Sequence, residues 1–503
     1  MPTSTPRSLL SLSLQSIGYG FGILGRQLII YVTLPFFTNK MTQKEFGVVS
    51  FSLAILGFVN VLTTAGLHGA IFRFYHDKDD IQSRRLVLGS SLFLLTMLAA
   101  LPAVIFLFMA RPLAQRLLND QVYAPVIQLS ALLLVIDTLV NYGYVLLRIE
   151  ARPIATSLTN LLIVASQMGV ALIMVYKYTQ GAFGYLSGLL IGEVIGLCLL
   201  SWLTRRIVAF NISRQSIGEL LRYGLPLLPA ALSMWALNLA DRTVLSQMVG
   251  LDQLAIYEVG YKMGAMVTLA AAPFRVAWPP FAFSVMRKPN AQAIYRDVVT
   301  YLLLASLLFA LGLLAFKSEI LRLLAPSSYS AAISVVDWVA LAQVFLSIQM
   351  VLSIGPKISK RTFDLTIVAM LSTAVYIALL IILIPLLGIV GAAISTTIGY
   401  GLLAFASYGI GQRSYPFPLD WNRLLRVVLA AGGSYLLIQF ADAIGVSGWT
   451  YYLFKMGAWL SFPVIVVLVG VITPLQLRGL LHLVSTMLRA RFKYTDQAAA
   501  HSP

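Results

Sequence analysis

Continuous apolar runs recur along almost the whole chain, separated by short polar segments. A run of about 20 apolar residues crosses the hydrocarbon core of a bilayer as an α-helix. The runs do not alternate between apolar and polar residues, which excludes a membrane β-barrel. The pattern predicts an all-α polytopic membrane protein with 14 transmembrane helices. The predicted spans are 12–37, 45–71, 86–109, 123–147, 154–176, 183–204, 217–249, 254–283, 298–316, 333–354, 363–384, 389–410, 424–441 and 452–472.

Composition agrees with this pattern. The chain is 59% hydrophobic and 11% charged, with a mean hydropathy of +0.85, well above soluble proteins. The net charge of +17 comes from Lys and Arg residues scattered through short loops. This distribution indicates contacts with membrane lipids and argues against a nucleic-acid partner. Cys198 is the sole cysteine, so no intrachain disulfide can form.

The distribution of basic residues predicts the orientation. Of 36 Lys and Arg residues, 24 fall in segments that alternation of the spans places on the side of the termini, and seven fall in loops on the other side. Cytoplasmic loops carry such an excess, so we expect both termini to be cytoplasmic. The first apolar segment lacks a small-residue cleavage site, so we expect it to be a retained helix.

The chain contains an internal repeat. RIEAR at 148–152 matches KISKR at 357–361, and GAFG at 181–184 matches GIVG at 388–391. Gly192 and Arg206 correspond in the same way to Gly399 and Arg413. Because the repeated unit holds an even number of helices, both copies point the same way through the membrane, which predicts two parallel six-helix lobes.

The repeat suggests four regions. The predicted regions are an N-lobe at 1–212, a C-lobe at 213–419, an extra helix pair at 420–474, and a cytoplasmic tail at 475–503. The tail begins with an amphipathic stretch at 475–492, whose arginines face away from its leucines, as expected for a helix lying on the membrane surface.

The residues of both lobes carry a family resemblance. LPFFTNKMTQKEFGVVSFSLAILGFVNVLTTAGLHGAIFRFY in the first two spans and YGLPLLPAALSMWALNLADRTVLSQMVGLDQLAIYEVGYKMG in the next lobe resemble the multidrug/oligosaccharidyl-lipid/polysaccharide exporter superfamily. The match is to its polysaccharide-flippase (Wzx-type) branch, which the final helix pair also resembles. The resemblance implies flipping of an undecaprenyl-pyrophosphate-linked oligosaccharide across the bacterial inner membrane by alternating access.

The same resemblance implies the biological setting. The cargo would serve a lipopolysaccharide or exopolysaccharide, and a polysaccharide polymerase and other export machinery are the expected partners besides membrane lipids. The sequence shows no metal-ligand spacing and no nucleotide-binding motif. We therefore predict a transporter that is not an enzyme and has no cofactor other than coupling to H⁺ or Na⁺.

Basic residues within spans are the candidate substrate ligands, because a guanidinium or ammonium group binds pyrophosphate through charge-assisted hydrogen bonds. They are Arg26, Arg242, Lys262 and Arg275. Arg26 either lines a cavity or pairs with a carboxylate such as Asp137. Arg275 either lines the cavity or reaches the headgroups, and the nearby Pro273 predicts a bend in that span.

The fourth span has a polar face. Asp137, Asn141, Tyr144 and Arg148 follow one another at helical spacing. A polar stripe facing lipid would be costly, so we expect this face to line the cavity or contact another helix. Asn141 and Arg148 are predicted to contact the substrate, and Asp137 to take part in ion coupling.

Acidic residues within spans are further candidates for ion coupling. Glu193 is isolated in an apolar run and either carries a proton or accepts an interhelical hydrogen bond. Glu258 precedes Lys262 by one helical turn, so the two form either a neutralising or a functional pair. Asp241 and Arg242 are neighbours, which do not face each other on a helix. Asp241 therefore either orients Arg242 through another helix or carries a proton.

Other classes of membrane protein remain to be distinguished. An ion-coupled multidrug antiporter is the main alternative, although an acidic and aromatic cavity would suit its organic cations better. A sugar-polymerising enzyme would need a large external loop, and the outer loops are all short. A major-facilitator transporter would need glycine between its second and third helices, where RFYHDKDDIQSRR has none.

Overall fold

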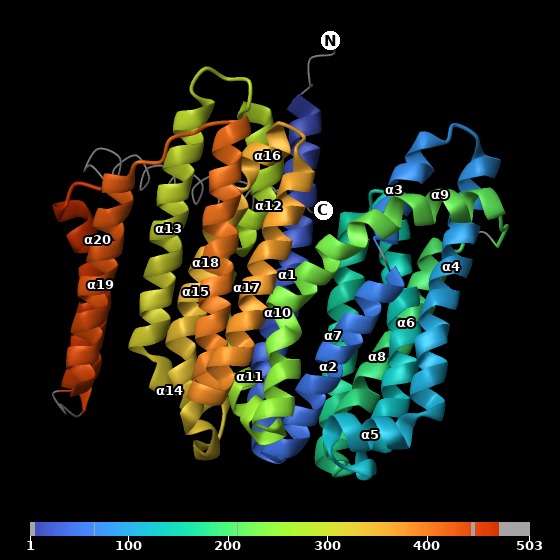
Figure 1. The fold of residues 1–503 in the computed structure, drawn as a ribbon, viewed down its shortest axis with the longest axis horizontal. Helices are drawn as coiled ribbons and strands as arrows, with labels where there is room; N and C mark the ends of the chain where they lie inside the picture. Colours follow the sequence, from blue (N-terminus) through green and yellow to red (C-terminus); the bar gives the residue numbers. More distant parts are fainter. Residues whose placement is uncertain (1–5, 65, 209, 444–447, 472–503) are drawn as a thin grey trace, which may run out of the picture.

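The computed structural model describes residues 6–64, 66–208, 210–443 and 448–471. Within these ranges every regular element is helical, as Figure 1 shows. The predicted all-α polytopic class is therefore confirmed. The amphipathic stretch predicted at 475–492 lies outside the described residues.

The first half of the chain forms eight α-helices. Asp80 accepts a hydrogen bond from the Ser83 amide at one helix start, and Asn119 adopts a left-handed conformation that ends another. The helices are α1 (Pro6–Lys40), α2 (Gln43–Thr64), α3 (Leu67–Asp77), α4 (Ile81–Phe108), α5 (Ala110–Leu118), α6 (Ala124–Ile149), α7 (Pro153–Lys177) and α8 (Gly181–Thr204).

The second half begins with a short helix that carries the chain across to a further set of long helices. The helices are α9 (Arg214–Gly224), α10 (Leu228–Met248), α11 (Leu251–Ala265), α12 (Val267–Val285), α13 (Ala291–Ala315), α14 (Lys317–Leu324), α15 (Ile333–Leu352), α16 (Ile354–Ile358), α17 (Thr362–Leu387), α18 (Ile389–Ser414), α19 (Trp421–Ala443) and α20 (Trp449–Leu468).

Twelve helical stretches among the described residues are long and apolar enough to cross a membrane, judged by length and composition. Helix α1 and the α11–α12 pair are not among them. The α11–α12 pair carries Glu258, Lys262 and Arg275, and such charges lower the hydropathy of a span. The predicted number of fourteen spans therefore stays a prediction.

The predicted eighth span is interrupted between α11, which ends at Ala265, and α12, which begins at Val267. Pro273 lies inside α12, and the bend expected there stays a prediction. At the interruption the Thr268 hydroxyl donates a 2.7 Å hydrogen bond to the Ala265 carbonyl. A side chain there satisfies a backbone group that a broken helix would leave unpaired.

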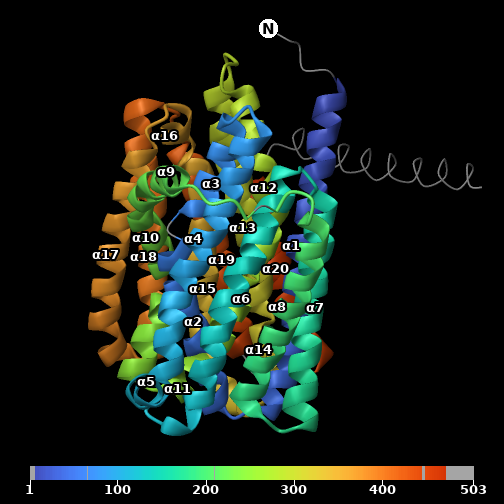
Figure 2. The same ribbon diagram turned by 90° about the vertical axis from the view of Figure 1, so that its right-hand side faces the viewer.

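The helices form two groups that stand side by side (Figure 1). The first helix group contains α1–α8, and the second contains α10–α18 with α19–α20 at its far side. Helix α1 packs on both α7 and α12, and α2 packs on both α10 and α11, so these helices form the junction. Figure 2 shows α3 and α9 near one end of the molecule and α5 and α14 near the other; we name these the α3/α9 end and the α5/α14 end.

Glycines permit the closest packing inside each group. A side-chain carbon at Gly192 of α8 would overlap Gln167 of α7, and one at Gly399 of α18 would lie 3.2 Å from Tyr376 of α17. The two glycines correspond in the sequence repeat, and each lies where two consecutive helices approach closely. Small residues at such crossings are typical of membrane helix packing. The two corresponding glycines therefore make the same kind of helix contact.

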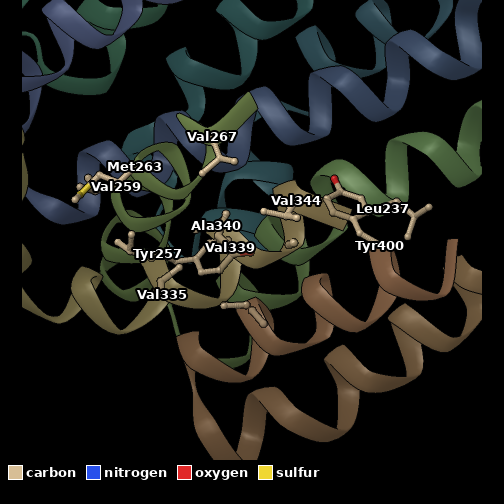
Figure 3. Close-up of a cluster of buried hydrophobic side chains, with 14 of the residues drawn as sticks. Leu237, Tyr257, Val259, Met263, Val267, Val335, Val339, Ala340, Val344 and Tyr400 are labelled. Atoms are coloured by element: carbon tan, nitrogen blue, oxygen red, sulfur yellow. The ribbon is translucent and has the colours of Figure 1, made fainter. Parts of the chain in front are cut away.

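A buried core holds α11 against α15 in the second group. Gly260 and Gly264 are one turn apart on α11, and side-chain carbons at these positions would lie 2.8 Å and 2.7 Å from Val335 and Val339 respectively. Figure 3 shows Val335, Val339 and Ala340 packed beside Tyr257, Val259 and Met263. This core fixes the helix that carries Glu258 and Lys262.

The α19–α20 pair is attached through buried charge. Lys455 of α20 is fully buried, and its ammonium lies 2.9 Å from an Asp442 carboxylate oxygen and 3.5 Å from one of Glu319 on α14. Its ammonium also lies 4.4 Å from the centre of the Tyr451 ring. Lys455 therefore ties the extra pair to the second group at the α5/α14 end.

Candidate functional site

Four charged side chains of α10 and α11 form one connected network at the junction of the helix groups. Gly250, with φ of 93°, makes the tight turn between these helices. The Arg242 guanidinium lies 2.8 Å from Asp241 Oδ1 and 3.1 Å from Glu258 Oε2. Lys262 Nζ lies 3.2 Å from the other Glu258 oxygen. The two cations and two anions balance, so the network is neutral as a unit.

Neutral groups complete the network. Arg242 donates a 2.7 Å hydrogen bond to the Asn238 carbonyl, and its guanidinium lies 4.0 Å from the centre of the Tyr261 ring. The Tyr257 hydroxyl donates to the second Asp241 oxygen. Asp241 and Arg242 are both buried, and buried charges require such partners.

The expectation that Asp241 and Arg242 do not pair is wrong. The Cα–Cβ bonds of Asp241 and Arg242 point in different directions from the helix. The long Arg242 side chain nevertheless folds back along its own helix, so its Nη1 reaches Asp241 Oδ1. The expected Glu258–Lys262 pair is present. The Nε and Nη1 donors of Arg242 are bound by protein groups, so these two nitrogens hold the side chain in the network.

A cavity of about 480 Å³ lies between the helix groups beside this network. Side chains from both groups line it, including Arg26 of α1, Asp137 of α6 and Glu193 of α8. Arg242, Glu258 and Lys262 form its wall on the second group. The junction between the halves of the chain therefore holds a polar cavity within a membrane-spanning fold.

Arg26 is the cavity cation that is not part of the network. It is exposed to the cavity, and the ion pairs found among the described residues do not include it. Asp137, its suggested partner, instead accepts a 2.7 Å hydrogen bond from Asn60 of α2. The Arg26 charge still acts on Asp137 and Glu193 through space. Arg26 thus presents guanidinium donors to the cavity.

Only one of the two carboxylate oxygens of Glu193 has a hydrogen-bond partner among the described residues. Its Oε1 accepts a 2.8 Å hydrogen bond from Gln167 of α7, whereas its buried Oε2 has no hydrogen-bond partner among the described residues. The sequence predicted that Glu193 either accepts an interhelical hydrogen bond or carries a proton, and this arrangement is compatible with both roles. One oxygen is held by an interhelical bond, and the other remains available to a proton or a cation.

A second cavity of about 190 Å³ extends the first toward the α3/α9 end. Arg26, Asp137 and Glu193 line both cavities. Asn141 and Arg148 line the second one, and Arg148 is exposed. The predicted polar face of α6 therefore lines a continuous polar path along the first group.

The opposite end of the junction is closed by contacts between the groups. Thr38 donates a 2.6 Å hydrogen bond to the Leu324 carbonyl, and Gln43 donates one of 2.7 Å to the Ser328 carbonyl. Gly47 of α2 lies so close to the Leu251 backbone that a side-chain carbon would overlap it. We call these contacts the α5/α14 seal.

Some predicted residues lie elsewhere, and several contributors were missed. Arg275 is exposed on α12 and does not line either cavity. Three further residues contact the site: Asn60, Gln167 and Tyr261. They were not identified from the sequence because their side chains are neutral. The detectable signal was a lone amide within an apolar run, as in FVNVL and ASQMG. No group of acidic, His or Cys side chains suited to a metal was found in the described part of the chain.

Solved structures show what this fold resembles. The lipid II flippase MurJ in an inward closed conformation matches with a TM-score of 0.73 at 14% identity, over 90% of this chain and 98% of that one. An inward-facing multidrug resistance MATE family transporter of the MOP superfamily matches with a TM-score of 0.63 at 18% identity, over 77% and 94%. A MOP superfamily transporter from Pyrococcus furiosus matches with a TM-score of 0.53 at 17% identity, over 82% and 98%. At these identities the matches show the fold alone.

The fold and the junction cavity define a multi-pass, all-α membrane protein with a polar cavity between two helix groups. Residues 41–334 match the family model described as polysaccharide biosynthesis protein. The chain belongs to this family, which confirms the resemblance found in the sequence. No curated protein matches the chain.

Proposed function

We propose that this protein flips a lipid-linked oligosaccharide from the cytoplasmic to the outer leaflet of the bacterial inner membrane. The cargo would be an undecaprenyl-pyrophosphate-linked sugar used for a cell-surface polysaccharide, with a polysaccharide polymerase acting on the product. The observation that carries the proposal is Arg26, a guanidinium that has no ion-pair partner among the described residues and lies in a cavity between two helix groups. Family membership at 41–334 supports the polysaccharide role.

The chemistry of Arg26 suits a pyrophosphate. A guanidinium donates two parallel hydrogen bonds to phosphate oxygens, and such charge-assisted bonds are about twice as strong as bonds between neutral groups. Arg148 and Asn141 lie along the path toward the α3/α9 end and would contact the headgroup as it enters. The polyprenyl chain would remain in lipid, since the cavity is polar where these residues line it.

The structure suits alternating access with the two groups as lobes at 1–212 and 213–419. The cavities reach toward the α3/α9 end, and the α5/α14 seal closes the other. With the α3/α9 end and both termini in the cytoplasm, this is an inward-facing arrangement. Opening the seal while closing the opposite end would deliver the headgroup outward.

Asp137 and Glu193 are the proposed coupling residues. Both carboxylates face the same cavities as Arg26. Binding of H⁺ or Na⁺ there would change the charge beside Arg26 and thereby its hold on an anionic headgroup. In contrast, Asp241 and Glu258 are committed to the neutral network, so we now assign them a structural role.

An ion-coupled multidrug antiporter is the second candidate. The specific observation in its favour is the same pair of cavity carboxylates, Asp137 and Glu193, because carboxylates attract organic cations. Arg26, which lines the same cavities, disfavours a cationic ligand. The two candidates therefore predict opposite effects of removing Arg26.

The test is a proteoliposome assay that compares translocation of a lipid-linked oligosaccharide with efflux of a cationic dye. We expect lipid translocation, a loss of at least tenfold in Arg26→Ala, and partial activity in Arg26→Lys. Arg413→Ala removes an exposed arginine away from both cavities and should behave like the wild type. Dye efflux without lipid translocation, or faster efflux in Arg26→Ala, would establish the antiporter instead.

A further inference from the structure

An apolar groove of about 420 Å³ lies on the first helix group, away from the junction cavity. Leu92 of α4, Leu139 of α6 and Leu197 of α8 line it, so it runs between three helices. Phe210, on the connection to α9, also lines the groove and is 79% exposed. The groove shares no lining residue with the two cavities around Arg26.

A basic pocket of about 150 Å³ adjoins this groove at the end of α8. Arg152, Arg205 and Arg206 line the pocket together with Trp202. Arg205 lines the groove as well, so the basic and apolar surfaces are continuous. A ligand that spans them must carry an anionic group next to a hydrocarbon chain.

The charges in the pocket are only partly compensated. Arg152 lies 3.2 Å from a Glu150 carboxylate oxygen. Arg205 and Arg206 are exposed and take part in none of the ion pairs found among the described residues. The Arg205 guanidinium lies 5.5 Å from the centre of the Trp202 ring, and that ring is 58% exposed. Exposed Trp and Arg side chains at a span end are typical of the lipid headgroup level.

We propose that this groove and pocket bind an anionic glycerophospholipid. Its phosphate would contact Arg205 and Arg206, and one acyl chain would occupy the leucine-lined groove. Basic pockets between membrane helices recognise anionic headgroups by this combination of charge and apolar surface. We assign a phospholipid rather than the transported lipid because the site is separate from the cavity that holds Arg26.

The position of the site gives the bound lipid a consequence for transport. Val208 and Phe210 lie on the connection between the two helix groups, and both line the groove. A lipid held there contacts three helices of the first group and this connection at once. Anionic phospholipid would therefore stabilise the arrangement of the connection seen here.

The test is native mass spectrometry of the full-length protein titrated with phosphatidylglycerol or phosphatidylcholine. We expect one tightly retained phosphatidylglycerol and at least tenfold weaker binding of phosphatidylcholine. Arg205→Gln/Arg206→Gln should lose the preference, whereas Arg413→Gln, at the end of α18 and outside the pocket, should keep it. Equal retention of the two lipids by the wild type would overturn the proposal.

Two further experiments test the contributions of the groove and of the basic pocket separately. Ser201→Trp fills the groove without changing charge and should weaken phosphatidylglycerol binding at least fivefold, whereas Ile195→Trp, exposed on α8 outside the groove, should not. If inorganic phosphate displaces the lipid at equal concentration, the groove contributes nothing and the proposal fails. Tighter retention of a polyprenyl phosphate than of phosphatidylglycerol would assign the site to the transported lipid instead. Unchanged elution and melting temperature of each variant establish that it is folded.

Discussion

Arg242 places a positive charge in a buried position where three protein groups compensate it. Removing its side chain leaves Asp241, which is fully buried, with two neutral donors and no cation: the Tyr257 hydroxyl and the backbone amide of residue 242. Truncating one member of a buried ion pair typically costs about 3–5 kcal/mol, because the other charge stays desolvated. We expect Arg242→Ala to lower the melting temperature in detergent strongly, and Arg26→Ala to leave it near that of the wild type.

The comparison separates a structural from a ligand-binding role. Arg242→Ala/Asp241→Ala removes one cation and one anion together, and should recover part of the lost stability. If Arg242→Ala melts like the wild type yet fails to transport, Arg242 is a substrate ligand and the network is not structural.

Asp137 differs from these residues because its charge faces the cavity. Asp137→Asn keeps the shape and the contact to Asn60 but removes the group that binds H⁺ or Na⁺. We expect transport driven by an imposed ion gradient to fall at least tenfold, while exchange without a gradient continues. Asp252→Asn, an exposed acid at the start of α11, should leave both rates unchanged. Equal loss of driven transport and exchange would contradict a coupling role.

The sequence revealed the charged members of the site but not their connections. Arg26, Asp137 and Glu193 were found because charge within an apolar run is rare and costly. The partners Asn60 and Gln167 were missed, since a neutral amide is a weak signal. Pairing within Asp241–Arg242 was mispredicted because helical spacing rules describe Cβ positions and ignore the reach of a long side chain.

Helix α11 carries two site residues, so its packing on α15 controls the geometry of the network. Gly264→Ala would place a carbon 2.7 Å from Val339 Cβ. Overpacking of this kind typically costs about 1–3 kcal/mol. We expect a lower melting temperature and weaker transport, both partly restored by Gly264→Ala/Val339→Ala. Gly409→Ala on α18, with no atom near the added carbon, should be neutral; the same loss there would show that the effect at Gly264 does not come from overlap with Val339.

At the element scale, long apolar helices were predictable and interruptions were not. The runs at 154–176 and 389–410 match α7 and α18 closely, since hydropathy alone defines them. At the break at Met266 the Thr268 hydroxyl donates a hydrogen bond to the Ala265 carbonyl, and hydrophobic periodicity does not predict such a local contact. The short helices α5 and α14 were likewise not predicted as elements.

Across the whole molecule, the repeat predicted more than any single motif. Gly192 and Gly399 correspond in the repeat, and each lies where its helix crosses the preceding helix closely. The junction itself was beyond sequence reasoning, because it brings together residues more than 200 positions apart. Tyr31 and Lys262 are an example, with the Tyr31 hydroxyl bonded to the Lys262 carbonyl at 3.0 Å.

Alternating access requires the α5/α14 seal to open, and this can be tested directly. In a Cys198→Ser background, Gln43→Cys/Ser328→Cys places one thiol on each helix group, at positions now joined by a 2.7 Å hydrogen bond. A short thiol-specific cross-linker that cannot be cleaved should hold the seal closed and reduce transport at least tenfold. A reducible cross-linker should do the same until it is reduced.

The matched control is Lys44→Cys/Asp120→Cys, which joins two positions within the first group that form a 3.1 Å ion pair. Rigid-body rocking leaves this distance unchanged, so cross-linking here should preserve transport. Together, the two cross-links show whether transport is lost because the helix groups cannot move relative to each other or because any cross-link stiffens the protein. Transport that survives the Gln43–Ser328 cross-link would mean that the substrate crosses without opening this end, and alternating access would then be wrong for this protein.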